Sequence, residues 1–223
     1  MRDAARGTRH EGKASRPAPG LRPPALVRSL GLQDYETVWQ QMRQFTAARN
    51  AETADEFWFV EHPPVYTLGV AARREHLPRM ANGIPVVKSD RGGQITYHGP
   101  GQVVAYTLLD LRRIGLGVRA LVRKLERAVI ELAADYRIDA RGREDAPGVY
   151  VDNAKIAALG LRIRDGRCYH GLSLNVDMDL SPFAAIDPCG YPGLEVTQLR
   201  NLGITDSPEA VAGRLAQKLA AVL

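Results

Sequence analysis

Several short stretches of the chain show either alternating apolar and polar positions or a continuous apolar run, both of which are typical of β-strands. They are residues 25–31, 56–62, 84–89 and 102–111 in the first half of the chain and residues 148–152, 155–163 and 168–176 in the second. Gly, Asp and Asn residues separate the last three stretches, and this spacing predicts a meander of short strands.

Three other stretches predict helices. The first begins at an N-cap, Asp34, and has five apolar side chains on one face: Tyr35, Val38, Trp39, Met42 and Phe45. The second covers residues 117–136 and has helical spacing at Val118, Leu121, Leu125, Val129 and Leu132. The third begins at an N-cap, Ser207, followed by Pro208 at the first helical position. Strands and helices mixed in this way predict an α+β or α/β fold.

The length and composition predict how the chain is divided. At 223 residues and 45% hydrophobic content it can bury one sizeable core, so we expect residues 25–223 to form a single domain with a smaller subregion. Residues 1–24 are rich in Arg, Pro, Gly and Ala and lack apolar periodicity. We expect them to form a disordered basic tail.

The charge is concentrated at one end. Residues 1–24 carry four of the five net positive charges, which leaves the remainder of the chain nearly neutral. Phosphate-backbone binding depends on clustered cations, so we do not expect a nucleic-acid partner. A local basic patch could still receive an acidic carrier protein.

Cysteine content and hydropathy bear on the compartment. Two cysteines cannot build a disulfide framework or a four-cysteine zinc site. No run approaches the roughly 18 to 20 consecutive apolar residues of a membrane span, and no signal-peptide apolar region is present. We therefore expect a cytoplasmic protein without a membrane partner, a metal or a cofactor.

The run RGGQITYHGPGQ, residues 91–102, contains four glycines among polar, aromatic and basic residues. Glycine allows the backbone to approach a bound molecule closely, and successive amides in a turn can point at a carbonyl or phosphate oxygen. The run is therefore either a ligand-binding segment or simply a glycine-rich turn before a strand, and composition alone leaves both open.

The two cysteines differ in their surroundings. Cys168 lies in an alternating, strand-like run, where a small buried thiol is usual. Cys189 lies between Pro188 and Gly190 in an irregular stretch of the kind that displays catalytic groups. Cys189 is the candidate nucleophile.

A cysteine nucleophile needs a base or a cation beside it, because a thiol of ordinary pKa is only a few per cent thiolate at neutral pH. Lys155, alone in the apolar run NAKIAALGLRI, could act as a fixed charge or as a base. His98 and His170 could instead form a cysteine–histidine pair. The residues themselves leave these alternatives open.

Four segments together resemble the lipoyl(octanoyl) transferases, the octanoyl-[acyl-carrier-protein]:protein N-octanoyltransferases of lipoate biosynthesis. The matching segments are RGGQITYHGPGQVVAYTLLDL (91–111), KIAALGLRI (155–163), HGLSLNVDMDL (170–180) and IDPCG (186–190), in the family's order and spacing. The resemblance covers roughly residues 26–223. It implies a mixed β-sheet with flanking helices and a smaller sheet, as in biotin and lipoate protein ligases.

The resemblance also implies residue roles. In that family the cysteine of the PCG loop carries an acyl thioester and the lysine of the KIAALG segment tunes or deprotonates it, which correspond to Cys189 and Lys155. The family's acyl pocket corresponds to fourteen residues here: Arg91, Gly92, Gly93, Gln94, Ile95, Thr96, Tyr97, His98, Ala158, Leu159, Gly160, Gly171, Leu172 and Ser173. The sequence departs from many relatives at Tyr150, where they carry tryptophan, and in its N-terminal extension.

The implied reaction is the first step of protein lipoylation. An octanoyl group passes from octanoyl-acyl carrier protein to Cys189 and then to a lysine of a lipoyl domain. The implied acceptors are the lipoyl domains of 2-oxoacid dehydrogenases and the glycine cleavage H protein.

Two alternatives are an ATP-dependent lipoate or biotin ligase of the same fold and a non-catalytic module that binds carrier or lipoyl domains. An adenylate-forming ligase has no use for a nucleophilic thiol, so Cys189 argues against the first. The presence of both Cys189 and Lys155 argues against the second.

Overall fold

The computed structural model describes residues 24–80, 83–187 and 193–223. The tail expected over residues 1–24 lies outside this part of the chain except for Pro24, and Cys189 also lies outside it. The domain boundary at residue 25 therefore stays a prediction.

A seven-stranded sheet forms the centre of the molecule, in the order β1-β2-β6-β10-β9-β8-β7. Its strands are β1 (Leu26–Leu32), β2 (Glu56–Glu61), β6 (Gln102–Asp110), β7 (Ala140–Gly142), β8 (Val149–Val151), β9 (Ala154–Arg164) and β10 (Arg167–Asn175). The pair β1–β2 is parallel, and every other neighbouring pair is antiparallel. The sheet is therefore mixed, as the family resemblance implies.

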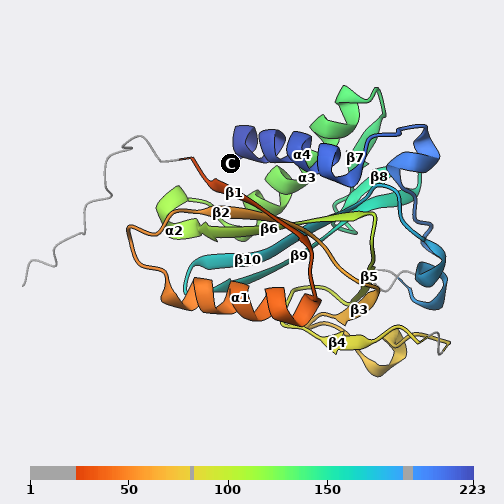
Figure 1. Cartoon of the computed structure of the whole chain (residues 1–223), viewed down its shortest axis with the longest axis horizontal. Helices are drawn as coiled ribbons and strands as arrows, with labels where there is room; N and C mark the ends of the chain where they lie inside the picture. The colour runs from red at the N-terminus through yellow and green to blue at the C-terminus, as the bar shows by residue number, and fades with distance from the viewer. Residues whose placement is uncertain (1–23, 81–82, 188–192) are drawn as a thin grey trace, which may run out of the picture.

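Helices cover both faces of this sheet. Helix α1 (Tyr35–Ala48) packs on one face, and α3 (Val118–Asp135) and α4 (Pro208–Val222) pack on the other (Figure 1). The four central residues of β2 are all apolar because its alternate side chains enter both layers: Phe57 and Phe59 face α3 and α4, whereas Trp58 and Val60 face α1. A short helix, α2 (Leu111–Ile114), follows β6.

A second sheet of three strands, in the order β4-β3-β5, lies at one end of the large sheet near the start of α1 (Figure 1). Its strands are β3 (Val65–Leu68), β4 (Val86–Lys88) and β5 (Ile95–His98), and the 3₁₀ helix η1 (Arg74–His76) connects β3 to β4. Its apolar side, formed by Tyr66, Ile95 and Tyr97, packs against Phe183 of the 3₁₀ helix η2 (Ser181–Ala185). A third 3₁₀ helix, η4 (Leu199–Leu202), precedes α4.

The fold class and the predicted strands and helices are confirmed. The two predicted caps are present: Asp34 accepts from the Thr37 amide, and Ser207 accepts from the Ala210 amide. Strand β9 has 11 residues and is longer than the predicted stretch 155–163, whereas β10 has 9 residues and lies one position before the predicted stretch 168–176.

Some details differ from the prediction. Val118, placed on the apolar face of its helix, is 46% exposed because it occupies the first helical position, before the packed stripe begins. Strands β3, β5 and β7 were not predicted. Strands β3 and β7 are only four and three residues long and have no clear period, and β5 lies inside the glycine-rich run.

Within the described residues, none of the helices has the length and apolar character that a membrane crossing requires.

Candidate active site

A cavity lies where the small sheet meets β9 and β10 of the large sheet. It brings together three separate segments that the sequence assigns to one pocket. The lining residues from those segments are Arg91, Gly93, Gln94, Ile95, Thr96, His98, Ala158, Leu159, Gly160, Gly171, Leu172 and Ser173. Tyr35, Val104, Tyr106 and His170 complete the lining.

Small residues on one face of β9 and β10 make room for this cavity. Ala158 pairs with Ser173 and Gly160 pairs with Gly171, so two successive cross-strand positions carry little or no side chain. A Cβ atom on Gly171 would lie 2.0 Å from the Ala105 carbonyl oxygen, so a larger residue there would force the strands apart. The floor is therefore narrow, apolar and fixed by backbone packing.

The side chain of Arg91 holds the glycine-rich segment in place. Its guanidinium donates to the Thr67 hydroxyl at 3.0 Å and to the Gly92 and Gln94 carbonyl oxygens at 2.9 Å each. Only 8% of Arg91 is exposed. Gly93 has φ 85°, in the left-handed region that favours glycine. Arg91 thus supports the cavity wall, and its charge is engaged by the protein's own backbone.

Neutral histidines lie beside the cavity. The imidazole of His98 stacks on Tyr35, with ring centroids 5.8 Å apart, and the ring of His62 lies 5.9 Å from that of His98. Burial, with a smaller contribution from His62, lowers the pKa of His98 to about 3. Burial also lowers the pKa of His62 to about 4. His62 is fully buried, and its Nε2 lies 2.8 Å from the Tyr106 hydroxyl.

A contact between Asp90 and His170 links the residue before the glycine-rich segment to β10, where His170 lines the cavity. His170 Nε2 lies 2.9 Å from Asp90 Oδ1, and Trp39 Nε1 donates to the same oxygen at 2.7 Å. Burial opposes ionisation of Asp90, but hydrogen bonds from His170 and Tyr169 outweigh it and lower the pKa of the carboxyl below its ordinary value. His170 has φ 63°, unusual for a residue other than glycine, and the Asp90 contact holds its ring in place.

Lys155 lies at the opposite end of the same strands. Leu161, the partner of His170, is six residues along β9 from Lys155, which is about 20 Å at a strand rise of about 3.3 Å per residue. His170 is therefore remote from Lys155. A smaller cavity is lined by Lys155, Asn175 and Phe183, and it shares Thr96, Ala158 and Ser173 with the main cavity. The lysine thus borders a small cavity that adjoins the main one through these three shared residues.

The Lys155 amine is buried and contacts several neighbouring groups. Only 3% of the residue is exposed, so it is not the exposed strand lysine that is usual in sheets. Its Nζ donates to the Pro147 carbonyl oxygen at 3.3 Å and lies 5.2 Å from the centroid of the Tyr150 ring. Gly148 has φ 149°, and a Cβ atom there would lie 3.0 Å from Lys155 Cε. The turn beside the lysine therefore requires glycine.

The carboxyl group of Glu126, on α3, interacts electrostatically with Lys155. Burial raises the pKa of Glu126, and the hydrogen bond from the Gly148 amide, followed by the positive charges of Arg123 and Lys155, partly offsets this increase. Glu126 Oε1 accepts from the Gly148 amide at 2.9 Å and so also fixes the turn beside the lysine.

Cys189 lies outside the described residues, but its described neighbours along the chain are anchored. Arg79 Nη2 donates to the Ala184 carbonyl oxygen at 2.9 Å and to the Ile186 carbonyl oxygen at 3.3 Å, and Arg79 Nη1 lies 2.7 Å from Asp187 Oδ1. After the gap, the Lys155 amide donates to the Glu195 carbonyl oxygen at 2.8 Å. The segment that leads to Cys189 is thus held by Arg79, and the segment that follows is held by Lys155.

Cys168 is a buried core residue, in agreement with the sequence. It is 0% exposed, and burial raises the pKa of its thiol to about 12. It therefore has no thiolate character near neutral pH.

Not every residue assigned to the pocket lines it. The Tyr97 side chain packs with Tyr66 and Phe183 on the other side of β5, and the Gly92 amide donates to the Leu161 carbonyl oxygen at 2.8 Å. The contributions of Tyr35 and Tyr106 were missed because they depend on how α1 and β6 pack. The apolar period of α1 marked Tyr35 as buried without showing what it faces.

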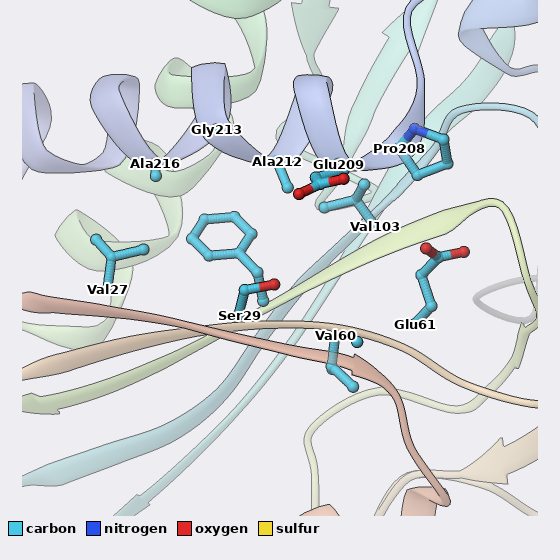
Figure 2. Close-up of a pocket in the computed structure, with 12 residues that line it drawn as sticks. Val27, Ser29, Val60, Glu61, Val103, Pro208, Glu209, Ala212, Gly213 and Ala216 are labelled. Atoms are coloured by element: carbon cyan, nitrogen blue, oxygen red, sulfur yellow. The ribbon is translucent and has the colours of Figure 1, made fainter.

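A larger cavity, of about 510 Å³, lies between α4 and strands β1, β2 and β6 (Figure 2). Figure 2 shows Val27, Val103 and Ala212 around the gap, with the carboxylates of Glu61 and Glu209 near one end. Glu61 accepts from the Gly101 amide at 2.7 Å. Among the described residues that the sequence assigns to the site, none lines this cavity.

Residues 34–220 match the lipoyl protein ligase A/B catalytic domain. Octanoyltransferases are similar over most of the chain. That of Nitrosospira multiformis is 62% identical, with 88% of this chain and 91% of the relative covered. That of Azoarcus sp. is 58% identical, with 96% of this chain and 92% of the relative covered. The chain belongs to the lipoyl protein ligase A/B catalytic domain family, and within it to the octanoyltransferases.

Solved structures agree on the fold. A bipartite lipoate protein ligase from Thermoplasma acidophilum has a TM-score of 0.69 at 16% identity, with 89% of this chain and 83% of the other covered. The biotin protein ligase of Aquifex aeolicus has a TM-score of 0.52 at 10% identity, with 89% and 68% covered. Both likenesses support the predicted ligase-like architecture.

Proposed function

We propose that this acyltransferase moves an octanoyl group from octanoyl-acyl carrier protein to a lysine of lipoyl domains, through a thioester on Cys189. The observation that carries the proposal is the buried amine of Lys155 beside a narrow apolar cavity, in a chain about 60% identical to octanoyltransferases. A saturated acyl chain carries no charge, so an apolar channel suits it and no charged side chain is needed to bind it. The small residues Ala158, Gly160, Gly171 and Ser173 would provide that channel.

In the first half-reaction the Cys189 thiolate attacks the donor thioester carbonyl, and the pantetheine thiolate leaves. One thioester replaces another, so this step is close to isoenergetic and reversible. An ammonium on Lys155 favours the thiolate of Cys189 and can supply a proton to the departing sulfur.

In the second half-reaction a lysine amine of the acceptor attacks the acyl-enzyme. Amide formation makes this step favourable overall. A neutral Lys155 can take the proton that the attacking amine loses, which returns Lys155 to its charged form and Cys189 to a thiolate. His98, with a pKa of about 3, is too weak a base for this task at neutral pH.

The test is transfer without ATP. The enzyme is incubated with octanoyl-carrier protein and a lipoyl domain, and the mass of the lipoyl domain is followed. The proposal predicts octanoylation without nucleotide because the donor thioester is already activated. Octanoylation that requires ATP and free octanoate would instead support the ligase alternative.

A further inference from the structure

The loop of residues 70–80 connects the cavity wall to the segment that leads to Cys189. Its Val70 and Ala71 amides donate to the Arg91 and Gly93 carbonyl oxygens at 2.9 and 3.0 Å. At its other end, the Arg79 amide donates to the Ala185 carbonyl oxygen at 2.8 Å. Figure 1 shows η1, within this loop, beside the small sheet at the outer end of the molecule.

The surface of this loop is unusual in two ways. Val70, Leu77 and Met80 are 61%, 42% and 63% exposed, which makes the loop and β1 the two places where exposed large apolar side chains gather in the described chain. Arg73 and Arg74 are exposed beside them. Exposed apolar side chains next to arginines are typical of protein-binding surfaces.

We propose that Arg73 and Arg74, with Leu77 and Met80, form the surface on which the acyl carrier protein docks to deliver its acyl group. This inference rests on the proposed function. It names which partner binds beside the site and where.

Charge favours the donor over the acceptor. The donor carries its acyl group on a phosphopantetheine arm, whose phosphodiester is an anion that arginine recognises well. The acceptor must instead bring a lysine to the acyl-enzyme, and clustered arginines would repel its ammonium form. Glu75 lies 3.8 Å from Arg73, is exposed with it and offsets part of the positive charge of the two arginines.

The experiment compares two donors, octanoyl-carrier protein and octanoyl-pantetheine, which lacks both the protein and the phosphate. The variant is Arg73→Glu with Arg74→Glu. A matched control reverses two exposed arginines of α3, Arg119→Glu with Arg127→Glu. The rate of acyl-enzyme formation is measured by rapid quench and intact mass, and thermal unfolding confirms that each variant folds.

We expect the Arg73/Arg74 variant to lose about tenfold or more in kcat/KM with octanoyl-carrier protein, chiefly through KM and with a weaker salt dependence. Its rate with octanoyl-pantetheine and the rates of the control should match those of the wild type. Leu77→Ser with Met80→Ser should show the same donor selectivity.

Equal rates for the Arg73/Arg74 variant and the wild type with the carrier donor would overturn the proposal, as would an equal loss with both donors. Transfer from preformed octanoyl-enzyme to a lipoyl domain is measured as well. Slowing of that step alone would assign the loop to the acceptor and also overturn the proposal. If the wild type accepts an acyl group from neither donor, the proposed function itself fails.

Discussion

Lys155 and Tyr150 face each other across β8 and β9, with the lysine Nζ 5.2 Å from the centroid of the aromatic ring. The ring is fully buried, and its hydroxyl donates to the Ala146 carbonyl oxygen at 2.8 Å. A π face attracts a cation, particularly where water is excluded. Tyr150 therefore stabilises a charged lysine beside the smaller cavity.

Replacing this lysine tests whether its charge activates Cys189. Lys155→Met keeps much of the volume and removes the charge, so we expect iodoacetamide to alkylate Cys189 about tenfold more slowly near pH 7. The difference should disappear above about pH 8.5, where an unperturbed thiol ionises unaided. Peptide mass measurement distinguishes Cys189 from Cys168, whose raised pKa keeps it unreactive.

Lys155→Arg separates charge from proton transfer. Arginine keeps a positive charge but does not release a proton at accessible pH, so it should restore alkylation more than transfer to the lipoyl domain. Lys218→Met, which removes a lysine paired with Asp135 on the surface, is the control and should change neither rate. Wild-type alkylation rates in folded Lys155→Met would contradict an electrostatic role for Lys155.

Arg79→Ala tests whether the segment before Cys189 must be held in place. The substitution removes the side-chain contacts to Ala184, Ile186 and Asp187. Because the side chain is 53% exposed, we expect the free energy of unfolding to fall by no more than about 1 kcal/mol. Alkylation of Cys189 and acylation by both donors should nevertheless slow several-fold.

Arg28→Ala is the matched control for Arg79. Arg28 is similarly exposed, at 54%, and is paired with Glu56. It lies on β1, an edge strand of the seven-stranded sheet. Arg28→Ala should leave both rates unchanged. Equal rates for Arg79→Ala and Arg28→Ala would mean that the Arg79 contacts do not position the nucleophile.

The buried histidines predict a specific pH dependence of stability. His62 and His98 have pKa values of about 4 and about 3 in the folded protein, below their value near 6.5 in the unfolded chain. The unfolded chain therefore binds more protons between these values, and the free energy of unfolding falls as pH drops. Their contribution is complete above about pH 6.5 and is lost progressively toward pH 4, then toward pH 3.

Urea unfolding between pH 7 and pH 4 measures this effect. We expect a loss of several kcal/mol, since each unit of pKa shift corresponds to about 1.4 kcal/mol. His62→Gln should reduce the slope because it removes one of the two groups. A free energy of unfolding that stays constant between pH 6.5 and pH 4.5 would show that these histidines are not held neutral by burial.

Local patterns in the sequence predict local structure well. The cap of α1 depends on Asp34 and Thr37, three residues apart, and the continuous apolar run in residues 56–62 lies within one strand. Both signals are read within a few residues, so both predictions are confirmed.

The remaining features depend on contacts between distant segments. Asp90 accepts from Trp39, Tyr169 and His170, residues up to 80 positions away, and nothing local marks it as a junction. The sequence assigned Arg91 to the pocket but could not show that its guanidinium is engaged by Thr67 and neighbouring carbonyl oxygens. The burial of Lys155 likewise follows from its pairing with Tyr150 and with the segment after residue 194.

The central claim is that Cys189 carries the acyl group, and intact-mass measurement tests it most directly. After incubation with octanoyl-carrier protein, the wild type and Cys168→Ala should each gain one octanoyl group, about 126 Da, that hydroxylamine removes as thioester chemistry requires. Cys189→Ala should gain nothing. A hydroxylamine-sensitive octanoyl adduct on Cys189→Ala would contradict the account.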